Sequence, residues 1–255
     1  MRGWKTASLA LAGGVAAGLI AGQTAHAGPF NLGDELFGHK PAKPPPLALY
    51  RDNADGDPAF ILDRSSSVVL LRFQDSPEIW LLTPHPAPRG DIIYKNDVGE
   101  AMLRATRLGG LTLFTSDRPD GMPAAMISDA PPLRLPPVPN ASVFLFRMAQ
   151  ASAHASHAVQ RLILFEARDP TPESAPLIAD AANVTAEAVV VMAKRADGKR
   201  ILLRLAKVIL TPGRRASVAL ANGVLEIVVV DKANTLIAAI AGRPSSRKIE
   251  LALAQ

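Results

Sequence analysis

The sequence predicts an α+β protein in which antiparallel β-meander sheets pack against two central helices. Short apolar runs with a two-residue period occupy residues 59–114 and return after residue 197. Residues 140–192 instead repeat apolar side chains at helical spacing. The expected order along the chain is therefore strands, two helices, strands.

The first 27 residues have the pattern of a secretory signal peptide. Arg2 and Lys5 precede an apolar run over residues 7–22, and Ala25 and Ala27 occupy the small-residue positions of a cleavage site. We expect Sec-type export with cleavage after Ala27, and no transmembrane segment after cleavage. The protein would then be periplasmic or secreted.

Composition limits the possible functions. Of the 255 residues, 228 follow Ala27, enough for one large domain or two small ones. Loss of Arg2 and Lys5 lowers the formal charge from +5 to +3, too small a basic balance to indicate a nucleic-acid partner. The chain contains no cysteine, which excludes disulfides and thiol chemistry.

Proline-rich segments suggest the organisation of the exported chain. Residues 28–47 resemble a tether and residues 131–139 a stiff connector. They delimit a β-rich half over 48–130 and a second half over 140–255, which we expect to form one compact unit. Residues 51–57 resemble a calcium loop, but Arg51 and Leu62 occupy positions that need acidic ligands, so we predict a turn before a strand.

The β-rich half begins with three predicted strands, at 59–63, 68–73 and 78–83. Pro84, Pro86 and Pro88 are expected to end the third strand. A further strand at 124–127 is expected at a sheet edge.

The stretch 89–114 is predicted to be a β-meander of three strands, at 91–95, 100–106 and 111–114. Asn96 to Gly99 and Gly109-Gly110 supply the turns. Its charged residues suggest a ligand cleft, with arginines for an anionic group and carboxylates for orientation or acid/base chemistry. Ordinary cross-strand ion pairs on a solvated face would explain the same pattern. The candidate binding residues are Arg89, Asp91, Asp97, Glu100, Arg104 and Arg107.

Two helices are predicted in the second half. The first is capped by Asn140 or Ser142 and runs to about residue 167. His154 and His157 on it could ligate a metal, but solvated histidines explain the pair better, and no metal or other cofactor is expected. The second is predicted to start at Thr171-Pro172 and to run to Met192, although residues 189–191 would also fit a strand.

Strands are predicted again towards the end of the chain. Alternating apolar residues at 201–205 and 225–229 indicate two of them, with turns at Pro212-Gly213 and Asn222-Gly223. Residues 236–241 and 249–254 are expected to complete an antiparallel set.

Compact catalytic motifs are absent from the sequence. It has no GxSxG, GxGxxG, phosphate-binding loop or HExxH. Ser245 to Lys248 match the Ser-x-x-Lys of penicillin-binding enzymes, but too few residues follow for the partner motifs. A triad dispersed along the chain would leave no such pattern.

Three segments carry a family resemblance: PAFILDRSSSVVLLRF, RGDIIYKNDVGEAMLRATRLGGLTLF and AGRPSSRKI. They resemble an uncharacterised family of secreted alphaproteobacterial proteins, a domain of unknown function. The resemblance implies export and a single family-wide unit, and it assigns no catalytic residue.

These observations favour an exported, non-enzymatic protein that binds a ligand or a protein partner in the cell envelope. The main alternative is an envelope-directed hydrolase that uses Asp91, Asp97 or Glu100 as acid or base. It requires one of these carboxylates to lie in a pocket with a raised pKa. A third hypothesis is an envelope assembly component that docks partners on its alanine-rich helices.

Overall fold

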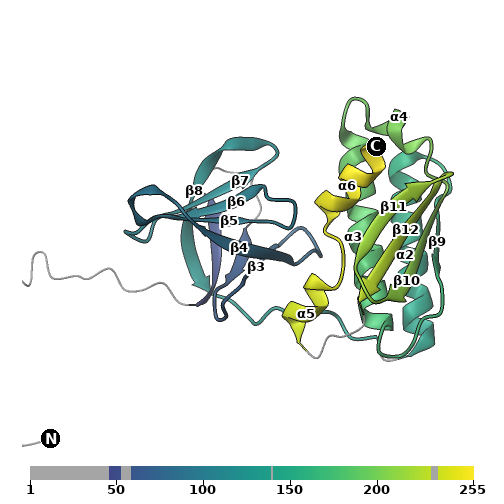
Figure 1. Cartoon of the computed structure of the whole chain (residues 1–255), viewed down its shortest axis with the longest axis horizontal. Helices are drawn as coiled ribbons and strands as arrows, with labels where there is room; N and C mark the ends of the chain where they lie inside the picture. Colours follow the sequence, from purple (N-terminus) through teal and green to yellow (C-terminus); the bar gives the residue numbers. More distant parts are fainter. Residues whose placement is uncertain (1–45, 53–58, 139, 231–234) are drawn as a thin grey trace, which may run out of the picture. The chain divides into compact units, whose positions relative to one another are not determined.

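The computed structural model describes residues 46–52, 59–138, 140–230 and 235–255. Within them a barrel of strands is followed by a layer of helices on a second sheet (Figure 1). The mixed helix and strand content is therefore confirmed, but the first sheet closes on itself and more than two helices are present. The predicted signal peptide, nearly all of the tether and residues 53–57 of the calcium-like segment lie outside the described residues.

The barrel is formed by eight strands, each antiparallel to the next along the chain, with β8 pairing back onto β1. β1 was not predicted, although its pairing with β2 on one side and β8 on the other closes the barrel. The strands are β1 (Leu47–Asp52), β2 (Phe60–Asp63), β3 (Val69–Phe73), β4 (Trp80–Pro86), β5 (Ile92–Lys95), β6 (Ala101–Ala105), β7 (Leu111–Thr115) and β8 (Arg118–Asp129).

Large apolar side chains fill the barrel interior. Phe60, Leu62, Leu71, Leu82 and Leu103 are fully buried and belong to one cluster. An eight-stranded barrel has an interior just wide enough for such side chains. The interior is therefore a packed core.

β2 and β3 are buried on their outer face as well. Ile61 and Leu70 point away from the interior and cluster with Leu133 of the proline-rich connector and Ile240 near the C-terminus. This second cluster explains why these strands are apolar at consecutive positions rather than at alternate ones. It joins the barrel to the second half of the chain.

The prediction that prolines end the third strand is wrong. β4 continues through Pro84 and Pro86, which pair with Tyr94 and Ile92 of β5. Ala87 donates its backbone N–H to the Asp91 carbonyl, so the odd-numbered residues point their N–H groups at β5. The missing N–H groups of Pro84 and Pro86 would therefore point towards β3. Because the pairing of β3 with β4 already ends at Leu82, the prolines cost the sheet no hydrogen bond.

The strand expected at 124–127 is longer and is not at an edge. It belongs to the twelve-residue β8, which pairs with β7 along its first part and with β1 along its last. Its two partners remove the free edges that an open meander would leave.

The predicted central meander is confirmed. β5, β6 and β7 pair in the expected order, with Ile93 opposite Arg104 and Arg104 opposite Thr112. Gly99 and Gly109 adopt φ values of 87° and 92° in the turns, a conformation that glycine reaches without strain. The turn residues therefore identified the hairpins correctly.

The first helix of the second half, α2 (Ala141–Val159), is shorter than predicted. Asn140 caps it by accepting the Val143 N–H at 2.9 Å, but Gln160 turns left-handed with φ 56° and ends it. Ser152 donates to the Ile163 carbonyl at 2.6 Å, which holds the returning chain against the helix. The following residues form strand β9 (Leu164–Ala167) rather than more helix.

The second long helix, α3 (Ala175–Lys194), starts a turn later than predicted. Thr171 accepts the Ser174 N–H at 3.2 Å in a preceding turn, and the helix continues from there. Residues 189–191 are helical, not strand. The apolar side chains predicted at helical spacing on this segment include Ile178, Ala182 and Val189, and all three are fully buried.

The second sheet is mixed rather than antiparallel. Its order is β11 (Ser217–Ala221), β12 (Val224–Val230), β10 (Lys207–Gly213), β9, and β10 runs parallel to both β12 and β9. Pro212 and Gly213 lie inside β10, where a turn was expected. The predicted Asn222-Gly223 hairpin is confirmed, with φ values of 51° and 78° at the two residues.

Three further segments predicted as strands are helical. α4 (Gly198–Leu202) contains part of the alternating run at 201–205, and α5 (Leu236–Ala241) and α6 (Ser246–Ala254) replace the last two strands. In α6 the buried apolar residues Ile249, Ala252 and Leu253 follow helical spacing. The Ser245 hydroxyl caps α6 by accepting the Lys248 N–H at 3.2 Å.

α3 is long and apolar enough to cross a membrane by length and composition, in a search of the described residues. Two thirds of its most apolar window is buried inside the protein (67%). It contacts α2, α4, α6 and strands β10 and β12. Such burial is typical of a core helix, which explains the apolar composition.

Candidate functional site

The first candidate site surrounds Asp91, the residue immediately before β5. Antiparallel pairing of Ile92 with Ala105 places Arg104 of β6 beside this carboxylate. Arg104 donates its Nε and Nη2 to Asp91 Oδ2 at 2.8 and 2.5 Å. The Asp91 side chain is 8% exposed and that of Arg104 is 47% exposed, so the pair presents mainly guanidinium to solvent.

Two more arginines complete this group, which we call the arginine cluster (Arg89, Asp91, Arg104 and Arg107). The Arg107 backbone N–H donates to Asp91 Oδ1 at 3.4 Å. Arg89 has φ 65°, an uncommon conformation for a non-glycine residue and often a sign of functional constraint. All three arginines are exposed.

The electrostatics of the arginine cluster favour an anion over proton transfer. Hydrogen bonds from Arg104 hold the pKa of Asp91 below its usual value despite burial, helped by the Arg107 N–H and the charges of Arg104 and Arg89. Asp91 is thus a carboxylate at neutral pH, suited to orienting Arg104 rather than to donating a proton. Three arginines and one aspartate leave a formal charge of +2.

The two remaining predicted site residues, Asp97 and Glu100, lie in the β5–β6 turn and contact the C-terminal segment. Asp97 Oδ1 accepts the Ser245 hydroxyl at 2.5 Å, and Glu100 Oε1 accepts Arg247 Nε at 2.7 Å. The six predicted residues therefore fall into two groups: the arginine cluster, and a carboxylate pair that binds the segment before and at the start of α6.

Next to that carboxylate pair is a set of charged groups that the sequence analysis missed, which we call the buried junction (Glu78, Asp180 and Arg243). Arg243 Nε donates to Asp180 of α3, and its Nη1 lies 3.5 Å from Glu78 Oε1. Its Nη2 also donates to the Ile79 carbonyl at 3.1 Å. The side chain of Arg243 is 1% exposed, so one buried guanidinium connects the barrel to the helical layer.

In the buried junction a single guanidinium contacts two carboxyl groups, so one negative charge is left unbalanced if both are ionised. The carboxyl group affected is that of Glu78. Burial raises the pKa of Glu78 to about 7, although Arg243 and the hydrogen bond from Ser246 act to lower it. Ser246 donates its backbone N–H to Glu78 Oε1 at 2.9 Å. The only sequence signals for this group were a glutamate before an apolar strand and an arginine inside the family segment AGRPSSRKI.

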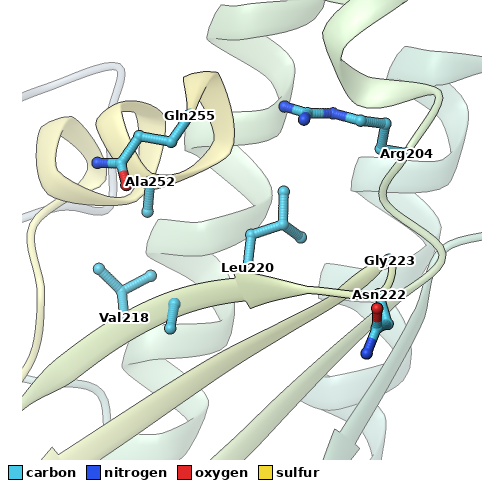
Figure 2. A pocket seen from close by; sticks show the side chains of 8 residues that line it. Arg204, Val218, Leu220, Asn222, Gly223, Ala252 and Gln255 are labelled. Carbon is cyan, nitrogen blue, oxygen red and sulfur yellow. The ribbon is translucent and has the colours of Figure 1, made fainter.

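The described part of the second half includes two hollows. One, of about 570 Å³, is lined by β11, the β11–β12 turn, Arg204 and the end of α6 (Figure 2). The other, of about 550 Å³, lies at the ends of α2 and α3 and includes His154 and His157 together with Lys194, Arg195 and Lys199. No group of three or more metal-ligating side chains was found among the described residues.

The fold and contacts define a protein in which an antiparallel barrel is joined to an α/β layer through a buried charged junction. The chain belongs to the family described as Domain of unknown function (DUF4908), whose model matches residues 34–253. The match spans both halves, which confirms the resemblance to a domain of unknown function. No curated protein and no solved structure matches the chain.

Proposed function

We propose that the protein is an exported, non-enzymatic binding module that recognises an anionic group of a cell-envelope ligand at the arginine cluster. The observation that carries this proposal is the contact between Asp91 and Arg104. A nearly buried carboxylate holds a half-exposed guanidinium by two of its nitrogens. Holding the guanidinium in this way reduces the entropy lost when an anion binds.

The ligand chemistry follows from the arginine side chains. Planar guanidinium groups bind carboxylate and phosphate oxygens in a bidentate manner. Three of them lie within one short stretch of barrel, and the single carboxylate among them is already engaged by Arg104 and Arg107. An anionic sugar, peptide or phosphodiester would supply the required group.

We prefer this proposal to the hydrolase hypothesis because of the contacts that Asp91, Asp97 and Glu100 make. A lowered pKa makes Asp91 a poor general acid near neutral pH. Asp97 and Glu100 are both hydrogen-bonded to the C-terminal segment. The assembly hypothesis is weakened because Ala181, Ala182 and Ala188 of α3 are buried in the core.

Thermal unfolding with a panel of small anions tests the proposal. Inorganic phosphate, glycerol phosphate and muramyl dipeptide present the two oxyanion types, and N-acetylglucosamine serves as a neutral control. A ligand at one hundred times its dissociation constant stabilises by roughly 2.7 kcal/mol, which raises the midpoint by roughly 5–11 °C in a chain of this size.

The variants locate the site. Arg104→Ala should abolish the shift, whereas Arg214→Ala removes the same charge from an exposed position after β10 and should preserve it. Raising the salt concentration should weaken binding, because the arginines are exposed. Equal shifts in both variants, or no shift with any anion, would show the proposed site to be wrong.

A further inference from the structure

The hollow beside α6 is a preformed site of mixed chemistry (Figure 2). Val218 and Leu220 lie on β11, the edge strand of the second sheet, opposite Ile227 and Leu225 of β12. Since Ile227 and Leu225 are fully buried, Val218 and Leu220 extend the core face to the sheet edge. There they meet Ala252 of α6 across the hollow.

Among the described residues that line this hollow, one side chain is charged. Arg204 is the charged member of a lining that otherwise consists of small, apolar and amide residues. Its Nη2 donates to the Leu253 carbonyl at 3.1 Å, which fixes the guanidinium near the end of α6. Among the described residues, its Nε and Nη1 have no hydrogen-bond partner, so two donors are available for a ligand.

The backbone around Arg204 is held closely. Gly223 adopts φ 78°, and a Cβ at this position would lie 2.8 Å from the Arg204 carbonyl oxygen. The Gly223 carbonyl in turn accepts the N–H groups of Ala206 and Lys207, at 2.8 and 3.2 Å. The hairpin turn and the segment carrying Arg204 are therefore locked together without a ligand.

The volume and the lining agree on one ligand class. A hollow of about 570 Å³ lies within the size range of small-molecule sites, and its lining is polar and apolar in nearly equal parts. A cation at one end of an apolar wall matches an acid head on a hydrocarbon body. We propose that this hollow binds a small aliphatic carboxylate, with the head on Arg204 and the chain along Val218 and Leu220. The site is distinct from the arginine cluster and does not depend on the proposed function.

Calorimetric titration of the full chain with hexanoate, octanoate and decanoate tests this inference. Each added methylene should tighten binding about fourfold until the chain fills the hollow, and acetate should bind too weakly to detect. Decanol has the same chain without the charge. It should bind roughly tenfold to a hundredfold more weakly than decanoate, which is the contribution of a charge-assisted hydrogen bond.

Two variants separate this site from other basic positions. Arg204→Gln removes the charge but keeps an amide donor for the Leu253 carbonyl, and it should bring decanoate down to the affinity of decanol. Arg200→Gln removes the same charge from an exposed position on α4 and should leave both affinities unchanged. Leu220→Ala should weaken decanoate and decanol by a similar factor.

Several results would overturn the inference. Equal affinities for decanoate and decanol in the unaltered protein would exclude recognition by Arg204 without requiring any variant. Absence of binding at millimolar concentrations would exclude the site. Loss of decanoate binding in Arg104→Ala, with retention in Arg204→Gln, would assign the carboxylate to the arginine cluster instead.

Discussion

The arginine cluster and the buried junction use the same chemical groups to opposite effect. In the cluster, one nearly buried aspartate is outnumbered by three exposed arginines, which leaves positive charge at the surface. In the junction, one buried arginine lies between two buried carboxylates, and no charge faces water. Burial therefore distinguishes the two groups: the exposed group is accessible to the anionic ligand that we propose, whereas the buried group connects two halves of the protein.

The difference should be largest when each central arginine is removed. Arg243→Met leaves Asp180 and Glu78 buried without their cation, and we expect a loss of roughly 3–5 kcal/mol in the free energy of unfolding. The midpoint of thermal unfolding should fall by roughly 6–20 °C. Urea unfolding measures the energy directly.

A second substitution sharpens that result. If the cost of Arg243→Met comes from uncompensated carboxylates, adding Asp180→Asn should recover part of it, because one buried charge disappears. If the double variant loses as much free energy of unfolding as the two single variants added together, packing and not charge dominates the junction.

The next prediction concerns pH. Glu78 has a pKa of about 7 in the folded protein against 4.5 when unperturbed, so between these values the folded chain retains a proton that the unfolded chain releases. The stability that depends on this proton is complete below about pH 4.5 and is lost as the pH rises through about 7. The expected loss is about 3 kcal/mol.

Glu78→Gln provides the comparison for this pH dependence. The amide imitates the protonated carboxyl group, so the variant should lack the decline that the unaltered protein shows between pH 4.5 and 7. The difference between the two denaturant midpoints, measured across this range, isolates Glu78 from other titrating groups. A constant difference would show that Glu78 is ionised, and stably paired with Arg243, throughout.

A smaller effect is expected at Ser245, which connects the two halves and caps α6. Its hydroxyl accepts the Lys248 N–H and donates to Asp97. Ser245→Ala should cost about 1 kcal/mol, the usual value of a helix cap.

Ser245→Asp separates the two contacts of this serine, because aspartate caps as well as serine but repels Asp97. We expect urea unfolding to show destabilisation that Asp97→Asn relieves. An unchanged Ser245→Asp protein would assign the whole effect to the cap.

The sequence was sufficient where structure is set locally. The meander at 89–114 was predicted strand by strand, because Asn96 to Gly99 and Gly109-Gly110 fix its turns. Closure of the barrel was not predicted, since β1 and β8 pair across most of the first half. The segments 236–241 and 249–254 were predicted as strands but are helices. In the second segment Ile249, Leu251 and Leu253 alternate as in a strand, whereas the buried residues Ile249, Ala252 and Leu253 follow helical spacing.

The contacts of the candidate residues follow the same rule. Asp91 and Arg104 are 13 residues apart on one hairpin, so their proximity followed from the meander. Arg243 is 63 residues from Asp180 and 165 from Glu78, and no local pattern relates them. The available signals were a glutamate before an apolar strand and an arginine inside the segment AGRPSSRKI, and neither identifies its partner.

The smallest predicted change in the free energy of unfolding is that caused by a substitution in the arginine cluster. Arg104→Ala should cost less than about 1 kcal/mol, because half-exposed ion pairs are screened by water and salt. Since the pKa of Asp91 is lowered, the stability that its carboxylate contributes is present above about pH 3.8 and is lost as the pH falls.

In 1 M salt the cost of Arg104→Ala should vanish, whereas that of Arg243→Met should persist, because buried charges are screened far less. Urea titrations at low and high salt on the two variants measure both effects together. Similar salt dependence in both would mean that water reaches the buried junction as freely as the arginine cluster.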